Sequence, residues 1–287
     1  MIADSHAHLS HFRFEGRFFG ILPREEDYAT GELSREELFL RMQEEGVVLS
    51  IEPAIELSSN RRILALHQRY PRRVFCAVGV HPTRTFFEKW RARRALEGYL
   101  SSPGVVAVGE TGLDLHMKGK KHLLCQTAWF LYQVRLAKKH RLPLVLHTRR
   151  ADRWVQCLLR LFGRGGRGGV VHCFSGDGRC ARRYLEMGYY IGIGGTLLQE
   201  GEDGQRLRGA LKDIPLECIL AETDAPYVLP TKRKKIGEKS TRNLRNTPLI
   251  LKEVIGKIAQ IKGVSFEEAE RVIFENTLRL FRLSSDQ

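Results

Sequence analysis

Residues 142–147 of the sequence, LPLVLH, decide the fold, because a short apolar run stands directly before a histidine. Successive apolar residues over 144–146 are typical of a strand that is buried on both faces, as in a parallel sheet. A helical stretch is expected over 152–162, and the next apolar run again ends on a histidine, His172. This strand–helix–strand order predicts two parallel strands joined by a crossover helix.

The same alternation extends over the rest of the chain. Strands are expected near residues 2–5, 47–52, 74–80, 105–110, 143–147, 169–173, 189–194 and 218–223. Helices are expected near residues 34–45, 59–70, 86–100, 122–140, 152–162, 179–187, 203–212, 247–262 and 265–281. Eight strands alternating with helices predict an α/β fold, a (β/α)8 TIM-like barrel that spans 1–287 as a single domain. A doubly wound open sheet would give the same alternation, and the periodicity does not separate the two.

Composition and charge limit the class of protein. The chain has 287 residues, 43% of them hydrophobic, and 47 Lys and Arg against 33 Asp and Glu, which gives a formal charge of +14. Recurring apolar runs exclude disorder as the main state, and no uninterrupted run approaches the roughly 20 residues of a membrane span. The start MIADSH lacks the features of a secretory signal, and the six cysteines form no C-x-x-C pair. We expect a cytoplasmic protein with reduced thiols, no membrane partner and an affinity for phosphate-bearing partners.

Two histidines end the first predicted strand. His6 and His8 are two residues apart, so in an extended chain their imidazoles point to the same side and can bind one metal ion. A pair of hydrogen-bonded histidines would give the same pattern.

Further polar residues end other predicted strands. Glu110 follows an apolar run, where a carboxylate must be paired or metal-bound, and a salt bridge would satisfy it as well. His147 and His172 end the fifth and sixth strands, and Asp224 ends the eighth as a candidate ligand and base. Barrel enzymes build their sites at these strand ends. Imidazoles with carboxylates suit Zn, Mg, Mn or Fe, and six ligands fit two ions better than one.

The motifs that surround these residues resemble those of the TatD family of metal-dependent deoxyribonucleases, within the amidohydrolase-like superfamily. The matching segments occur in the family's order: DSHAHL (4–9), GVHP (79–82), VGETGLD (108–114), LPLVLHTRRA (142–151), HCFSG (172–176) and ETDAP (222–226). The resemblance covers most of the chain.

The resemblance implies a TIM-like barrel, one to three divalent cations and hydrolysis of phosphodiester bonds in DNA, in the manner of a 3′-5′ exonuclease, and with six ligands we expect two cations per chain. It implies that Glu110 and Asp224 are catalytic. The implied metal ligands are His6, His8, Glu110, His147, His172 and Asp224. His81, Arg149 and Ser175 match positions that we expect to contact the substrate.

Three features depart from the family pattern. An insertion over residues 10–33 enlarges the first βα loop, and its Phe, Tyr and Arg residues could stack bases and hold phosphates or pack on the barrel rim. Residues 231–245 carry seven basic residues and one acidic residue, which is typical of a polyanion groove or of a solvated loop. Asn246-Thr247-Pro248 stands where the family often has Asn-Glu-Pro.

The residues leave two other functions open. The same metals could serve an ester or amide hydrolase, such as a D-aminoacyl-tRNA deacylase, although a glutamate where many amidohydrolases have a modified lysine favours the phosphodiesterase. A third hypothesis is a basic, non-catalytic subunit that binds nucleic acid. The complete ligand set argues against it, because binding alone does not require six metal-binding groups.

Overall fold

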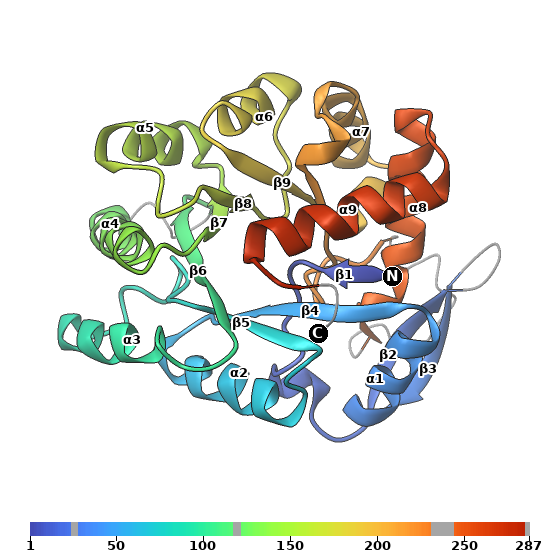
Figure 1. The fold of residues 1–287 in the computed structure, drawn as a ribbon, viewed down its shortest axis with the longest axis horizontal. Coiled ribbons are helices and arrows are strands. Elements are labelled where there is room, and N and C mark those ends of the chain that lie inside the picture. The colour runs from blue at the N-terminus through green and yellow to red at the C-terminus, as the bar shows by residue number, and fades with distance from the viewer. Residues whose placement is uncertain (24–27, 117–121, 231–243, 285–287) are drawn as a thin grey trace. The chain divides into compact units, whose positions relative to one another are not determined.

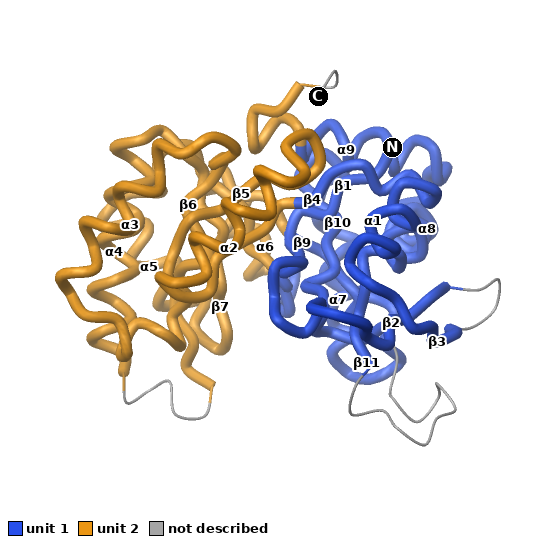
Figure 2. Tube along the Cα trace, turned by 90° about the horizontal axis from the view of Figure 1, so that it is seen from below, with its two compact units in different colours: residues 1–50, 173–178, 192–277 blue, residues 51–172, 179–191, 278–287 orange. Residues whose placement is uncertain are grey.

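The computed structural model describes residues 1–23, 28–116, 122–230 and 244–284. Their contacts divide the chain into two compact units, which Figure 2 colours separately. Unit 1 comprises residues 1–50, 173–178 and 192–277, and unit 2 comprises residues 51–172, 179–191 and 278–287.

The eight predicted strands are all present and belong to one sheet in which they follow one another in chain order. They are β1 (Ile2–Asp4), β4 (Val47–Pro53), β5 (Val74–Val78), β6 (Val105–Asp114), β7 (Leu144–Arg149), β8 (Gly169–Val171), β9 (Tyr189–Ile193) and β10 (Ile219–Ala221). The Ser5 amide donates to the Ala221 carbonyl (2.9 Å), which links the first strand to the last. A doubly wound sheet would reverse its order at one point. The (β/α)8 barrel class is therefore confirmed.

Helices follow the strands along the chain, as the colour gradient of Figure 1 shows. They are α1 (Arg35–Glu44), α2 (Leu57–Arg69), α3 (Arg93–Tyr99), α4 (Leu123–His140), α5 (Asp152–Phe162), α6 (Gly178–Leu185), α7 (Glu202–Asp213), α8 (Leu251–Lys262) and α9 (Phe266–Phe281). Local signals set several boundaries. Ser34 caps α1 through a capping box with Glu37, because each side chain accepts from the other residue's backbone amide.

The helix predicted over 86–100 is shorter in the structure. Residues 86–89 lie outside it, a 3₁₀ turn covers Trp90–Ala92, and α3 begins at Arg93. The Glu88 carboxylate accepts a hydrogen bond from the Leu57 amide (2.9 Å) at the start of α2. The hydrogen bond between Glu88 and Leu57 outweighs the helical preference of residues 86–89. Sequence periodicity alone does not reveal such a contact between two segments.

The insertion over residues 10–33 contains regular structure. Strands β2 (Phe18–Pro23) and β3 (Tyr28–Leu33) pair antiparallel, and β11 (Leu244–Arg245) pairs with β2 in parallel. Phe14 and Phe18 are buried edge to face, whereas Phe12 and Phe19 are exposed. Part of the aromatic set therefore packs inside unit 1, as one of the two interpretations expected. The basic segment predicted over 231–245 falls outside the described residues except for β11.

The sheet strands are buried on both faces, as the apolar runs indicated. All residues of β5 are buried, and Leu144, Val145 and Leu146 of β7 are fully covered.

The six cysteines are free thiols. Within the described residues, no helix combines the length and apolar character needed to cross a membrane.

A partly buried carboxylate in unit 1 gives a pH prediction. Glu253 of α8 accepts a hydrogen bond from the Tyr28 hydroxyl of β3. Burial raises the pKa of Glu253 above its ordinary value of 4.5, although the Tyr28 hydrogen bond opposes the shift. The folded state then binds the proton more tightly than the unfolded state. The stabilisation is therefore complete below the unfolded pKa and is lost as pH rises through the folded one.

Glu253→Gln is expected to flatten this fall in the free energy of unfolding, measured by urea denaturation from pH 4.5 upward. Glu275→Gln on α9, whose carboxylate pairs with Arg271 at the surface, serves as the control. Parallel pH curves for the wild type and Glu253→Gln would contradict the assignment.

Candidate metal-binding clusters

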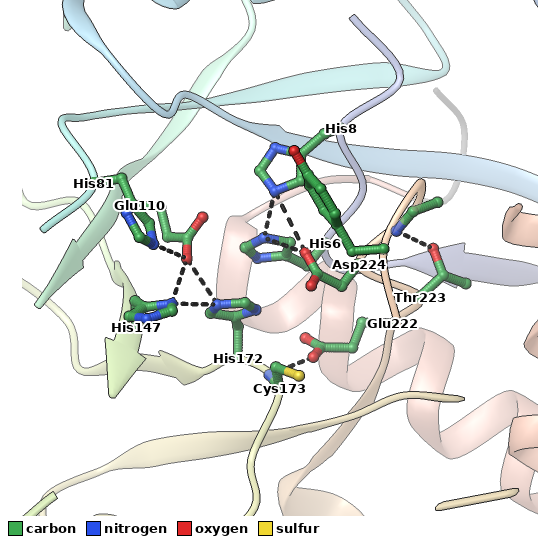
Figure 3. Close-up of polar contacts among 12 residues, drawn as sticks. His6, His8, His81, Glu110, His147, His172, Cys173, Glu222, Thr223 and Asp224 are labelled. Carbon is green, nitrogen blue, oxygen red and sulfur yellow. Dashed lines mark hydrogen bonds and ion pairs between the residues drawn. The ribbon is translucent and has the colours of Figure 1, made fainter. Parts of the chain in front are cut away.

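The first cluster lies in unit 1 and consists of His6, His8 and Asp224, labelled in Figure 3. The Nε2 atoms of His6 and His8 are 3.3 Å apart. The Asp224 Oδ1 atom lies 3.6 Å from His6 Nε2 and 3.4 Å from His8 Nε2. Both histidines are buried, while the Asp224 side chain keeps 15% of its surface exposed. Three donor atoms thus converge, and the Asp224 side chain that supplies one of them is partly accessible to solvent.

Hydrogen bonds that the Asp4 carboxylate accepts hold the chain in place at this cluster. Its Oδ1 atom accepts from the amides of His6 and Thr223 (both 3.1 Å), and its Oδ2 accepts from the Thr223 hydroxyl (2.6 Å). The Asp224 amide also donates to the His6 carbonyl (2.9 Å). Burial raises the pKa of Asp4 to about 7, against the lowering effect of these hydrogen bonds. Asp4 therefore links the end of β1 to the residues that follow β10.

The second cluster lies in unit 2 and is centred on Glu110, which is 3% exposed. Its Oε1 atom lies 2.8 Å from His172 Nε2, 2.9 Å from His147 Nδ1 and 3.3 Å from His81 Nε2 (Figure 3). The His147 Nδ1 and His172 Nε2 atoms are 3.2 Å apart. These residues come from β6, the end of β7, the residue after β8 and the segment after β5. One carboxylate oxygen is thus surrounded by imidazole nitrogens.

Asp114 is a residue of this cluster that the sequence reasoning missed. Its Oδ2 atom lies 3.1 Å from His147 Nε2, on the opposite side of the ring from Glu110. Gln126 fixes the Asp114 backbone, because its side chain accepts from the Asp114 amide (2.8 Å) and donates to the Asp114 carbonyl (3.1 Å). The available signal was strand periodicity, since residues 110 and 114 of one strand point to the same side.

The surroundings of the second cluster shift the pKa of Glu110, His147 and His81. Burial opposes ionisation of Glu110, but His172 and His81 hold its pKa well below the ordinary value. Burial alone would lower the pKa of His147, yet its contacts with Asp114 and Glu110 raise that pKa to about 9. Burial lowers the pKa of His81, against the attraction of Glu110. The ionised Glu110 carboxylate is therefore stabilised by positive charge on its neighbours, a role that a bound cation can take in place of the imidazole protons.

The donor sets of both clusters fit divalent cations. Within each of two groups the donor atoms lie within 4.8 Å of one another: His6, His8 and Asp224, and His81, Glu110 and His147. Facing imidazole nitrogens 3.2–3.3 Å apart share at most one proton, whereas a cation can accept both lone pairs. Imidazole with carboxylate is the ligand chemistry of Zn, Mn or Fe rather than of a thiolate site.

The predicted site residues take different positions. His6, His8 and Asp224 come together in unit 1, and Glu110, His147 and His172 come together in unit 2. His81, predicted as a substrate contact, joins the Glu110 group. Arg149 is exposed at the end of β7, and Ser175 is exposed with its carbonyl accepting from Arg206 Nε (2.9 Å).

The chain is similar to a defined family of proteins. It matches the family described as TatD related DNase over residues 3–282. YabD of Bacillus subtilis, an uncharacterized metal-dependent hydrolase, is 30% identical over 99% of this chain and 100% of the relative. The 3′-5′ ssDNA/RNA exonuclease TatD of Edwardsiella piscicida is 35% identical over 85% of this chain and 92% of the relative. The crystal structure of YJJV, a TatD homologue from Escherichia coli K12, gives a TM-score of 0.80 at 28% identity, covering 99% of this chain and 98% of that one.

Proposed function

We propose, on the premise that this chain belongs to the TatD related DNase family of metal-dependent hydrolases, that it cleaves phosphodiester bonds in DNA as a 3′-5′ exonuclease. The observation that carries the proposal is the Glu110 carboxylate, buried with imidazole nitrogens of His81, His147 and His172 within 3.3 Å of one oxygen. The name of the Edwardsiella piscicida relative supports the choice of nucleic acid as substrate.

The proposal assigns a divalent cation to each cluster. His6, His8 and Asp224 would hold one, and Glu110, His147 and His172 would hold the other, with His81 beside Glu110. When bound, such cations acidify a coordinated water and neutralise charge on phosphoryl oxygens. Asp114 acts as a positioning residue, because its contact with His147 Nε2 fixes the ring and directs Nδ1 toward Glu110.

Asp224 is the proposed proton acceptor for the attacking water. Its carboxylate lies against two imidazoles and is also the solvent-accessible member of the first cluster, so a water molecule can reach it. Arg149, exposed at the end of β7, and Ser175, exposed after β8, are proposed to contact the substrate phosphates.

Removal of metal tests this assignment. Chelation is expected to abolish hydrolysis of a 5′-labelled single strand, and added Mn²⁺ or Mg²⁺ to restore it, with products that shorten from the 3′ end. Elemental analysis is expected to find about two divalent ions per chain, falling to about one in the double variant His6→Ala/His8→Ala.

Full activity in chelator would overturn the proposed function. Hydrolysis of a D-aminoacyl-tRNA or of a cyclic amide without cleavage of DNA or RNA would replace it with the ester or amide hydrolase.

A further inference from the structure

The segment that carries His81 also presents a row of aromatic rings to solvent. Phe86 is 55% exposed and Phe87 is 72% exposed. The rings of Phe86 and Phe87 meet edge to face with centroids 5.6 Å apart, and Phe86 packs on His122 at 4.1 Å. We call Phe86, Phe87 and His122 the ring platform. It lies wholly within unit 2, as does the Glu110 cluster.

Backbone turns tie the ring platform to His81. The Arg84 amide donates to the His81 carbonyl and the Phe87 amide donates to the Arg84 carbonyl, both at 2.9 Å. Each such turn keeps the Cα atoms at its two ends within about 7 Å of each other, so the Cα atoms of His81 and Phe87 lie within about 14 Å of each other. The platform is therefore a fixed neighbour of the residue that contacts Glu110.

Side chains on both sides of the rings hold this segment in place. Thr85 is buried and its hydroxyl donates to the Pro82 carbonyl (2.8 Å). Glu88 accepts from the Leu57 amide, and Trp90 packs edge to face on the buried Trp129 with centroids 5.7 Å apart. The exposure of Phe87 therefore follows from an anchored backbone rather than from a loose loop.

The charge around the rings suits an anionic polymer. Residues 84–94, RTFFEKWRARR, contain five basic residues and one acidic residue, Glu88, whose carboxylate is engaged at Leu57. Within the part of the chain that the structure describes, Lys89, Arg91 and Arg94 form no ion pair, and all three are exposed. Aromatic faces flanked by cations are what a single strand requires, because bases stack on rings while phosphates contact cations.

We propose that the ring platform binds unpaired nucleobases of a single-stranded nucleic acid, with Phe87 as the principal stacking residue. This inference rests on the proposed function, since it names the part of the substrate that this surface recognises. Bases in a duplex already stack on one another, so the platform favours single strands over duplexes.

A binding experiment on the metal-loaded protein tests the platform apart from cleavage. The probe is a phosphorothioate-linked single strand of about 12 nucleotides, within the usual site size of a single-strand groove. Phe87→Ala is expected to raise its Kd about tenfold, and Phe87→Trp to leave it near the wild-type value. An abasic strand of the same length is expected to bind wild type and Phe87→Ala equally well. Metal content and hydrolysis of bis(p-nitrophenyl) phosphate are expected to be unchanged in Phe87→Ala.

Phe162→Ala is the matched control. Phe162 is 58% exposed at the end of α5, so this substitution removes another exposed ring that is remote in sequence from His81. Weaker base-dependent binding by Phe87→Ala supports the platform even if no nucleic acid is cleaved, in which case only the proposed function fails. Cleavage with an unchanged Kd in Phe87→Ala overturns the platform and leaves the function intact. Equal weakening of the abasic strand by Phe87→Ala also overturns base recognition.

Discussion

Glu110→Gln is expected to lower kcat for phosphodiester hydrolysis by about 10³-fold and to remove one metal ion per chain. The carboxylate supplies the negative charge that three imidazoles surround within 3.3 Å, and the neutral amide of Gln is a much weaker ligand. Gln has nearly the same volume, so the fold is expected to persist. Steady-state kinetics on a single strand, elemental analysis and circular dichroism measure the three quantities.

Glu97→Gln is the matched control for this change. Glu97 is also a carboxylate of unit 2, but it pairs at the surface with Lys139 Nζ at 2.5 Å. Its loss is expected to leave kcat and metal content within about twofold of the wild type, because exposed ion pairs contribute little. Wild-type turnover in Glu110→Gln, with the full metal content, would remove Glu110 from the site.

Asp4→Ala is expected to lower the free energy of unfolding by about 3 kcal/mol, because it leaves buried donors without an acceptor. The carboxylate is fully buried and accepts from the His6 amide and from the amide and hydroxyl of Thr223. Urea denaturation in the presence of chelator measures the change, since bound metal would itself stabilise the folded state. Loss of Asp4 also frees the His6 amide and Thr223, the residue before Asp224. His6 belongs to the first cluster and Thr223 adjoins it, so weaker metal binding is expected in titrations.

Thr223→Val provides the comparison. It removes the hydroxyl's hydrogen bond to Asp4 and the one that the hydroxyl accepts from the Ala225 amide (3.2 Å), and it retains the contact of the Thr223 amide with Asp4, so a loss of about 2 kcal/mol is expected. A cost for Asp4→Ala no larger than that of Thr223→Val would mean that Asp4 does not tie β1 to the segment after β10.

Several parts of the site could be predicted from the sequence because local rules govern them. The positions of His6 and His8, two residues apart after a short strand, follow from the period of an extended chain. His147 and His172 each follow an apolar run, so their place at a strand end follows from burial of the run. The contact of Asp114 with His147 required the register of β6 against β7, in which Gly112 lies opposite His147.

The sequence by itself determined the eight strands, most of the helices and the chemistry of the donor set, because burial periodicity and capping act within a few residues. Only the tertiary structure decided which aromatic rings are covered and which face solvent. Phe14 and Phe18 are buried beside the sheet formed by β2, β3 and β11, while Phe87 is exposed on an anchored segment. The physical reason is that such burial depends on partners in other strands, such as Leu33 of β3 opposite Phe18 of β2, which no local pattern specifies.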